Sequence, residues 1–110
     1  MIKKVNLPIF HGTLILFCDH DIKEAFSLIN EKYDGKEFGA YSVVAIDKEG
    51  RQGFVIIFDE CTHETISHEA VHIANRIAEE HELKKDEELI AYLTGWVTAQ
   101  CYKYLKVTGR

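Results

Sequence analysis

Five apolar residues in a row, Phe54-Val55-Ile56-Ile57-Phe58, constrain the fold more than any other feature of this sequence. The run is short, rich in β-branched and aromatic side chains, and bounded by Gly53 and Asp59, which is typical of a β-strand. Neighbouring side chains of a strand point to opposite faces of its sheet, so both faces of this strand need cover. The run therefore predicts an interior strand.

Two other segments predict strands. Residues 13–18 are apolar and partly β-branched, whereas residues 41–47 mix polar with apolar side chains, which suits an edge strand. The polar stretch 48–53 contains glycine and has the length of a hairpin connection between residues 41–47 and the interior run. We therefore expect a small, mostly antiparallel sheet of about three strands.

Three segments have apolar residues at helical spacing, over about residues 22–33, 62–80 and 86–105. The end signals are Asp21 and Asp34-Gly35 for the first helix, Thr62 or Thr65 for the second, and Asp86 or a neighbour for the third. The expected fold class is α+β, with one N-terminal helix, the small sheet and two C-terminal helices.

Length and charge limit the classes of function. A chain of 110 residues predicts one domain, 1–110. The net charge is −5 and no basic stripe is present, so nucleic acid is not an expected partner. The longest strongly apolar run, residues 14–18, is too short to span a membrane. Three widely spaced cysteines predict reduced thiols rather than a disulfide framework, and so a cytoplasmic protein.

The segment His68-Glu69-Ala70-Val71-His72 fits the pattern H-E-x-x-H within the second predicted helix. Residues four apart lie one turn above each other on the same face, so both imidazoles can reach one zinc ion. Glu69 is about 100° round the helix axis from His68, beside the ion rather than on it, where a carboxylate can accept a proton from water. The alternative is a pair of solvent-facing histidines on an amphipathic helix.

A catalytic zinc ion usually has three protein ligands, and we expect the third on the last helix. Residues 79–82 are two to three turns beyond His72 and cannot easily reach back. Glu88 is preferred because the side chains that share its helix face are mostly small, which lets that face approach another helix closely. These side chains are Ala91, Tyr92 and Gly95. Glu87, about 100° away round the axis, stays the competing candidate.

The pairing of residues 68–72 with Glu88-Leu89-Ile90-Ala91-Tyr92 resembles the gluzincin pattern, in which HExxH is followed by a glutamate in an E-x-x-A setting. Residues 86–96 are similar to small uncharacterised phage and bacterial proteins of that kind, and the resemblance covers about residues 41–105. It implies a minimal zincin-like domain that binds Zn²⁺. The ligands it implies are His68, His72 and Glu88, with Glu69 as general base.

These features predict a zinc metallopeptidase that hydrolyses peptide bonds of a peptide or protein substrate with a metal-activated water and Glu69 as general base. The substrate would lie extended along an exposed sheet edge. Tyr92 and Tyr41 are candidates for contacts with the substrate or the transition state, and a core position is the alternative for Tyr92. The alternative function is a non-catalytic, zinc-stabilised module that binds a partner protein, because no second cleft wall and no oxyanion donor are evident. The sequence predicts neither the substrate nor the oligomeric state.

Overall fold

Strands and helices follow one another along the chain in an order that the local sequence patterns largely explain. The computed structural model describes residues 2–18, 22–29, 39–46, 50–83 and 85–108. Its elements, in chain order, are β1 (Ile2–Asn6), β2 (Thr13–Cys18), α1 (Ile22–Leu28), β3 (Ala40–Ile46), β4 (Gln52–Phe58), α2 (His63–Glu80) and α3 (Glu87–Tyr104). The predicted start of α1 at Asp21 and its predicted end at Asp34-Gly35 lie outside the described residues.

The four described strands form one mixed sheet in the order β1-β2-β4-β3. β1 pairs antiparallel with β2, and β3 pairs antiparallel with β4. The two central strands run parallel, with Ile15 opposite Val55. The α+β class is confirmed, but the expectation of about three mostly antiparallel strands is wrong in detail. The additional strand β1 precedes β2, so α1 follows two strands rather than one, and the parallel pairing joins segments that are distant in sequence.

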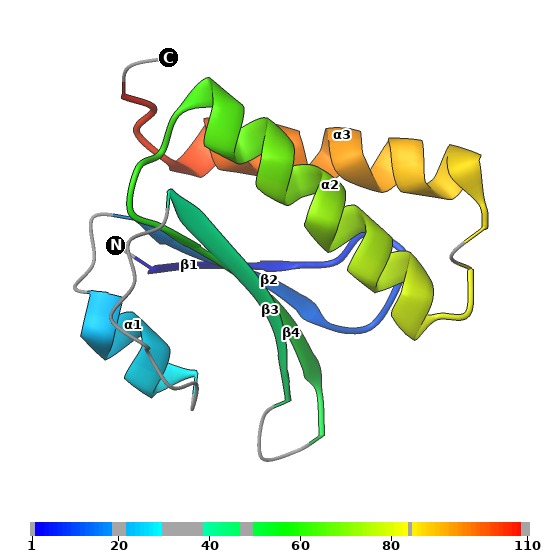
Figure 1. The fold of residues 1–110 in the computed structure, drawn as a ribbon. Helices are drawn as coiled ribbons and strands as arrows, with labels where there is room; N and C mark the ends of the chain where they lie inside the picture. The colour runs from blue at the N-terminus through cyan, green and yellow to red at the C-terminus, as the bar shows by residue number, and fades with distance from the viewer. Residues whose placement is uncertain (1, 19–21, 30–38, 47–49, 84, 109–110) are drawn as a thin grey trace.

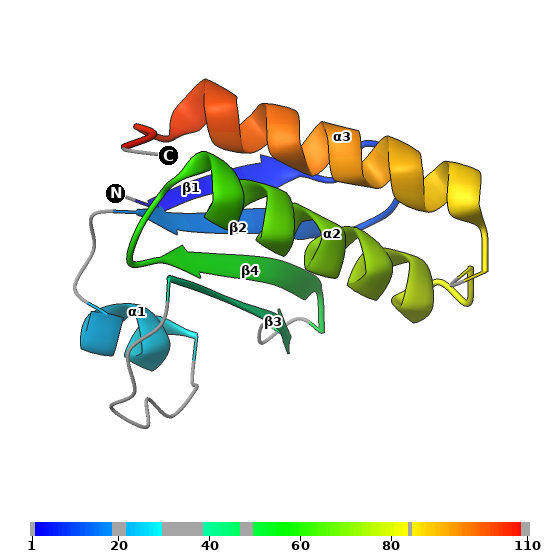
Figure 2. The same ribbon diagram turned by 45° about the horizontal axis from the view of Figure 1, so that its top comes forward.

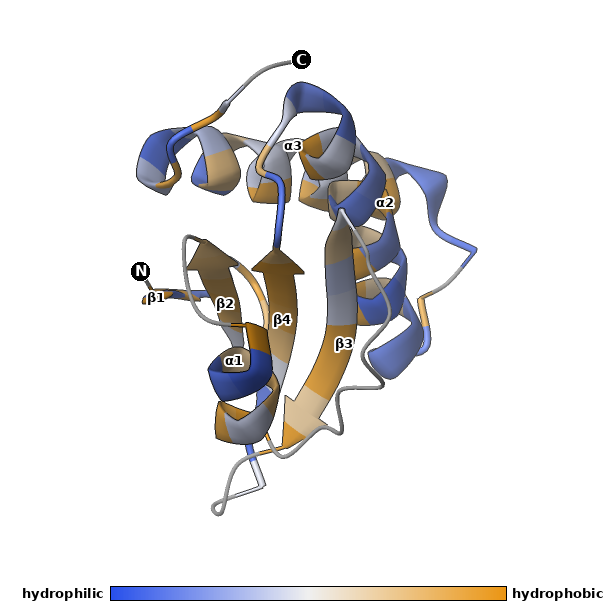
Figure 3. Cartoon of the chain, turned by 60° about the vertical axis from the view of Figure 1, so that its left-hand side comes forward, coloured by the Kyte–Doolittle hydropathy of each residue, from blue (hydrophilic) through white to orange (hydrophobic). Residues whose placement is uncertain are grey.

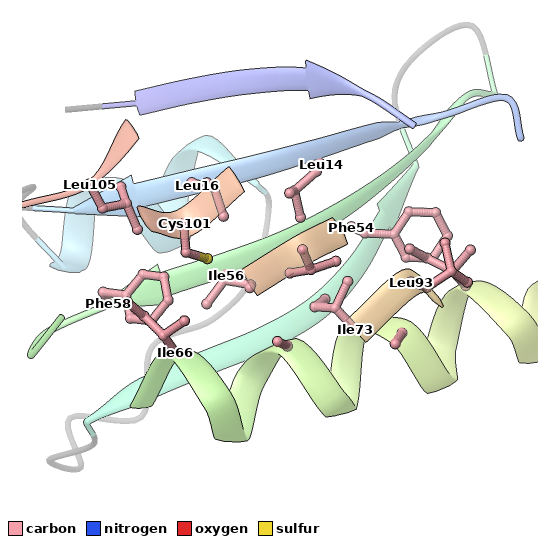
Figure 4. Packing of buried hydrophobic residues seen from close by; sticks show 14 of the residues in the cluster. Leu14, Leu16, Phe54, Ile56, Phe58, Ile66, Ile73, Leu93, Cys101 and Leu105 are labelled. Atoms are coloured by element: carbon pink, nitrogen blue, oxygen red, sulfur yellow. The ribbon is translucent and has the colours of Figure 1, made fainter. Parts of the chain in front are cut away.

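The strand predicted to be interior is β4, and every residue from Gly53 to Phe58 is buried. Its side chains alternate between two apolar clusters. One cluster lies between the sheet and helices α2 and α3, and it contains Phe54, Ile56 and side chains from both helices (Figure 4). The other lies on the opposite face, where Phe26 of α1 packs with Val55. This confirms the predicted cover on both faces.

The helices thus form layers on the two faces of the sheet, with α2 and α3 side by side on one face and α1 on the other (Figures 1 and 2). Figure 3 shows the central strands as hydrophobic along most of their length, whereas the outward sides of α2 are hydrophilic. None of the helices in the described ranges combines the length and the apolar character that crossing a membrane requires.

Local caps fix where α2 and α3 begin. The Thr62 hydroxyl accepts a hydrogen bond from the Thr65 backbone N–H at 3.1 Å, and the Thr65 hydroxyl accepts one from the Thr62 N–H at 2.9 Å. This reciprocal pair is a capping box with threonine at both positions. The Asp86 carboxylate accepts from the Leu89 N–H at 3.0 Å. Both start sites agree with the predicted caps, so the HExxH segment lies in the middle of a well-defined helix.

Candidate metal centre

His68 and His72 lie one turn apart on α2, and their rings meet at the exposed surface of the helix. Their Nε2 atoms are 3.1 Å apart, close enough for one ring to donate a hydrogen bond to the other. Two nitrogen ligands about 2.0–2.1 Å from a tetrahedral zinc ion are themselves about 3.3 Å apart. The pair therefore has nearly the separation that two ligands of one ion require.

Glu69 is the one buried polar or charged residue in the part of the chain that the structure describes, with 4% of its surface exposed. Among those residues its carboxylate has neither a hydrogen-bond partner nor an ion-pair partner. Burying a carboxylate without partners costs free energy, because the group loses its hydration and gains nothing in return. A buried polar group of this kind, one residue after His68 and three before His72, points to a chemical role.

The position of Thr65 shows which neighbour Glu69 faces. A Cβ atom added to Gly39, which directly precedes β3, would come within 3.1 Å of the Thr65 Cγ2 atom, so this side of α2 lies against the start of β3. Glu69 and His72 follow Thr65 at four and seven positions and share its side of the helix. Glu69 therefore lies on the side of α2 that faces the start of β3, the strand that was predicted to be an edge.

The predicted edge position of residues 41–47 is confirmed, because β3 ends the strand order and pairs only with β4 among the described strands. The backbone N–H and C=O groups on the other side of β3 have no strand partner in the described sheet. An open edge of this kind can pair with an extended peptide through main-chain hydrogen bonds. The buried carboxylate and the strand edge thus belong to the same side of α2.

Glu88 lies in the first turn of α3 and is exposed. The face of α3 that packs in the core carries Leu93, Val97 and Cys101 instead. The expectation that the Glu88 face approaches another helix is wrong: a Cβ atom added at Gly95 would meet no atom within 4 Å. Small residues permit close packing, but larger apolar side chains on the other face gain more from burial and so determine how α3 is turned.

The side of α2 that contacts α3 is not the side that carries the histidine pair. At the start of α2, the His63 Nδ1 atom hydrogen-bonds the Tyr102 hydroxyl of α3. At 100° per residue, His68 and His72 are about 140° and 180° round the helix axis from His63, and so point away from α3. The described residues accordingly contain no group of three or more His, Cys, Asp or Glu side chains that could hold a metal ion.

Neither tyrosine candidate is brought to the side of α2 that faces β3. Tyr92 is 50% exposed and follows Glu88 by one turn on the exposed face of α3, so it is not a core aromatic. The Tyr41 ring packs against Phe26, with 5.0 Å between the ring centroids, on the sheet face covered by α1. The strand alternation that places Tyr41 there directs Ala40 and Val44 toward α2.

No protein-family model matches this chain, and no curated protein or solved structure shows significant similarity to it. The resemblance to gluzincins therefore rests on the sequence motif alone. What the structure adds is the geometry of the histidine pair, the burial of Glu69 and the open edge of β3.

Proposed function

We propose that the chain is a zinc-dependent hydrolase of peptide bonds, with His68 and His72 as zinc ligands and Glu69 as the general base. The observation that carries the proposal is the 3.1 Å separation of the two Nε2 atoms beside a buried carboxylate without a partner in the described chain. A helix that served only to stabilise the fold would need neither the close histidine pair nor the buried carboxylate.

A site of this kind usually needs three protein ligands, and the 3.1 Å separation of the Nε2 atoms supports His68 and His72 as two of them. Glu88 is the third ligand that the family resemblance implies, but its side chain is exposed on α3, and the histidines are on the side of α2 that points away from α3. Zinc binding is therefore proposed for the histidine pair, and Glu88 is tested separately.

The chemistry that zinc supplies in such sites is polarisation of the scissile carbonyl and activation of a water molecule. Glu69 takes a proton from the attacking water as the new C–O bond forms, and passes it to the amine nitrogen as the C–N bond breaks. The burial of Glu69 favours this role, because few other water molecules can compete with the attacking water for hydrogen bonds to a carboxylate that is shielded from bulk solvent.

The edge of β3 is the proposed position of the substrate. A peptide paired with β3 would be held by backbone hydrogen bonds, which do not depend on its sequence, and would pass the side of α2 that carries Glu69 and His72. This arrangement supports an endopeptidase with broad sequence tolerance rather than a hydrolase of small esters.

One observation favours a second candidate, a non-catalytic zinc-binding module. The histidine pair is exposed, and the described residues assemble no third ligand beside it. A zinc ion held at the surface of α2 could be completed by a side chain of a partner protein, which would join the two proteins rather than cleave one of them.

Cleavage of a mixed peptide library by the zinc-loaded protein, followed by mass spectrometry, separates the two candidates. The hydrolase proposal predicts cleavage that is lost with Glu69→Gln, while the variant keeps its zinc. A fully zinc-loaded wild type that cleaves nothing would favour the module, and a Glu69→Gln variant as active as wild type would contradict Glu69 as the base.

A further inference from the structure

Four exposed side chains follow one another at intervals of four residues along α2: Glu64, His68, His72 and Arg76. Residues four apart form a continuous ridge on the surface of a helix, so these side chains lie in one row. The row is on the outward side of α2, because the buried Ala70 and Ala74 are each two residues, or about 200° round the axis, beyond one of the histidines. Figure 3 shows this outward side as hydrophilic. The ridge is therefore open to another molecule.

The two ends of this ridge carry opposite charges. The side chains of Glu64 and Arg76 have neither a hydrogen bond nor an ion pair among the residues that the structure describes. They are twelve residues apart, or about 18 Å along the helix axis, so they cannot pair with each other. Both charges are therefore available to a partner.

The two histidines in the middle of the ridge supply half of a tetrahedral zinc site. Their Nε2 atoms are 3.1 Å apart, and the described part of the chain assembles no third His, Cys, Asp or Glu beside them. A zinc ion in a closed protein site is almost always bound by four ligands. A second copy of the same ridge would bring a second pair of imidazoles, which is the number that the ion lacks.

A two-fold arrangement of two chains brings the ridges together in matching order. In most dimers of identical chains the same surface patch of each copy meets itself. With the axis midway between His68 and His72, the two α2 helices run antiparallel and the four imidazoles converge. Glu64 is four residues before His68 and Arg76 is four residues after His72, so Glu64 of each copy lies opposite Arg76 of the other. Ridges of this spacing lie along each other in the commonest class of helix packing, in which the axes cross at about −50°.

We propose that zinc joins two copies of this chain through this ridge, with one ion bound by His68 and His72 of both copies and two ion pairs between Glu64 and Arg76. Each chain carries a net charge of −5, so two copies repel each other without the metal, and the dimer depends on zinc. Four imidazoles leave no coordination position for water, so the dimer is a closed form of the proposed hydrolase centre. The inference rests on the zinc ligands of the proposed function but not on hydrolysis.

Sedimentation equilibrium of the whole chain at rising zinc concentration, with bound zinc measured in the same samples, tests this proposal. We expect monomers in a chelator, dimers at half an equivalent of zinc per chain, and monomers again in large excess of zinc, where each chain binds an ion of its own. A chain that binds zinc but stays monomeric at half an equivalent would overturn the dimer and leave the proposed ligands standing. A chain that binds no zinc would overturn both, and dimers that persist in the chelator would overturn the bridging role of the metal.

Reversal of single charges tests how the two copies are arranged. Arg76→Glu places like charges opposite each other at both ends of the interface, so dimerisation at half an equivalent of zinc should weaken about tenfold or more. Glu64→Arg should weaken it similarly, and the double variant Glu64→Arg/Arg76→Glu should restore it, because both ion pairs form again with the charges exchanged.

Lys106→Glu, a cation-to-glutamate change at an exposed position beyond α3, is the matched control for Arg76→Glu and should leave dimerisation unchanged. Dimerisation of Arg76→Glu as tight as that of wild type, or a double variant as weak as the single ones, would contradict the assigned interface.

Discussion

The His63 ring at the start of α2 contacts the Tyr102 ring near the end of α3, with 5.5 Å between the ring centroids and a hydrogen bond between Nδ1 and the hydroxyl. This contact identifies the side of α2 that faces α3. His72 is about 180° round the helix from His63, so the candidate metal ligands face the opposite direction. The relation between these two sides of α2 determines which residues can complete a metal site.

Removal of the Tyr102 hydroxyl tests this contact. Because the hydrogen bond is exposed, Tyr102→Phe should lower the free energy of unfolding by only about 0.5–1 kcal/mol. Tyr92→Phe makes the same change on the exposed face of α3, where the described residues offer the hydroxyl no hydrogen-bond partner, and should have no effect. Urea unfolding of both variants gives the comparison, and equal losses in the two would show that the His63 contact contributes nothing.

Glu88→Ala should keep the zinc content and affinity of the wild type, because the Glu88 side chain is exposed on α3 and the histidine pair points away from that helix. Zinc titration of the purified variant with a competing chelator checks the expectation. Loss of zinc from Glu88→Ala, with binding retained in Glu87→Ala, would show that α3 rearranges and supplies the ligand that the gluzincin resemblance implies.

Glu69 should reduce the stability of the fold, because its buried carboxylate has no partner in the described chain. Glu69→Met replaces the charge with an apolar side chain of similar length and should raise the free energy of unfolding by about 1–3 kcal/mol in metal-free protein. Glu79→Met at an exposed position of α2 is the control, with an expected change within about 0.5 kcal/mol. Denaturant unfolding would contradict this account if Glu69→Met proved less stable than wild type.

Cys101 should make stability depend on pH in the alkaline range. Burial, with Cys61 and Cys18 nearby, raises the pKa of the Cys101 thiol from 9.0 to about 12. Between these values the unfolded chain loses the proton that the native state keeps, so the thiol's contribution to stability is complete below pH 9 and falls as the pH rises toward 12. The free energy of unfolding of wild type should therefore fall more steeply over this range than that of Cys101→Ala, and parallel curves would contradict the shifted pKa.

Much of the fold could be predicted from local sequence. Thr62 and Asp86 cap their helices by hydrogen bonds to residues three positions later, and such short-range chemistry is visible in the sequence. The interior position of β4 followed from its unbroken apolar run. These predictions succeeded because each depends on residues that are close together in the chain.

Other features depend on long-range packing, which the local pattern does not encode. β1 carries Lys3 and Lys4 and has little apolar character, yet it is a strand because it pairs along β2. Lysines suit such an edge strand, since they discourage pairing with other chains. The parallel alignment of β2 with β4 likewise cannot be seen in either strand alone.

In the candidate site too, some features follow from local sequence and others depend on long-range packing. The separation of His68 and His72 follows from helix geometry and was predictable from their spacing of four residues. The placement of Glu88 depends on how α3 is turned, and the small residues on its face gave the wrong indication. The burial of Glu69 depends on how the rest of the chain packs against α2, as the start of β3 does at Thr65, and no local signal in the sequence marks that packing.

The most direct test of the account is the zinc content of the purified protein and of variants in each histidine, measured by atomic emission after equilibration with zinc. Wild type and the exposed control His11→Ala should bind about one ion per chain at α2. His68→Ala and His72→Ala should each lose the ion, because the single imidazole that remains in either variant does not hold it without the second ligand of the pair. Zinc binding by His68→Ala or His72→Ala that equals that of the wild type would contradict the central claim that this pair forms the metal centre.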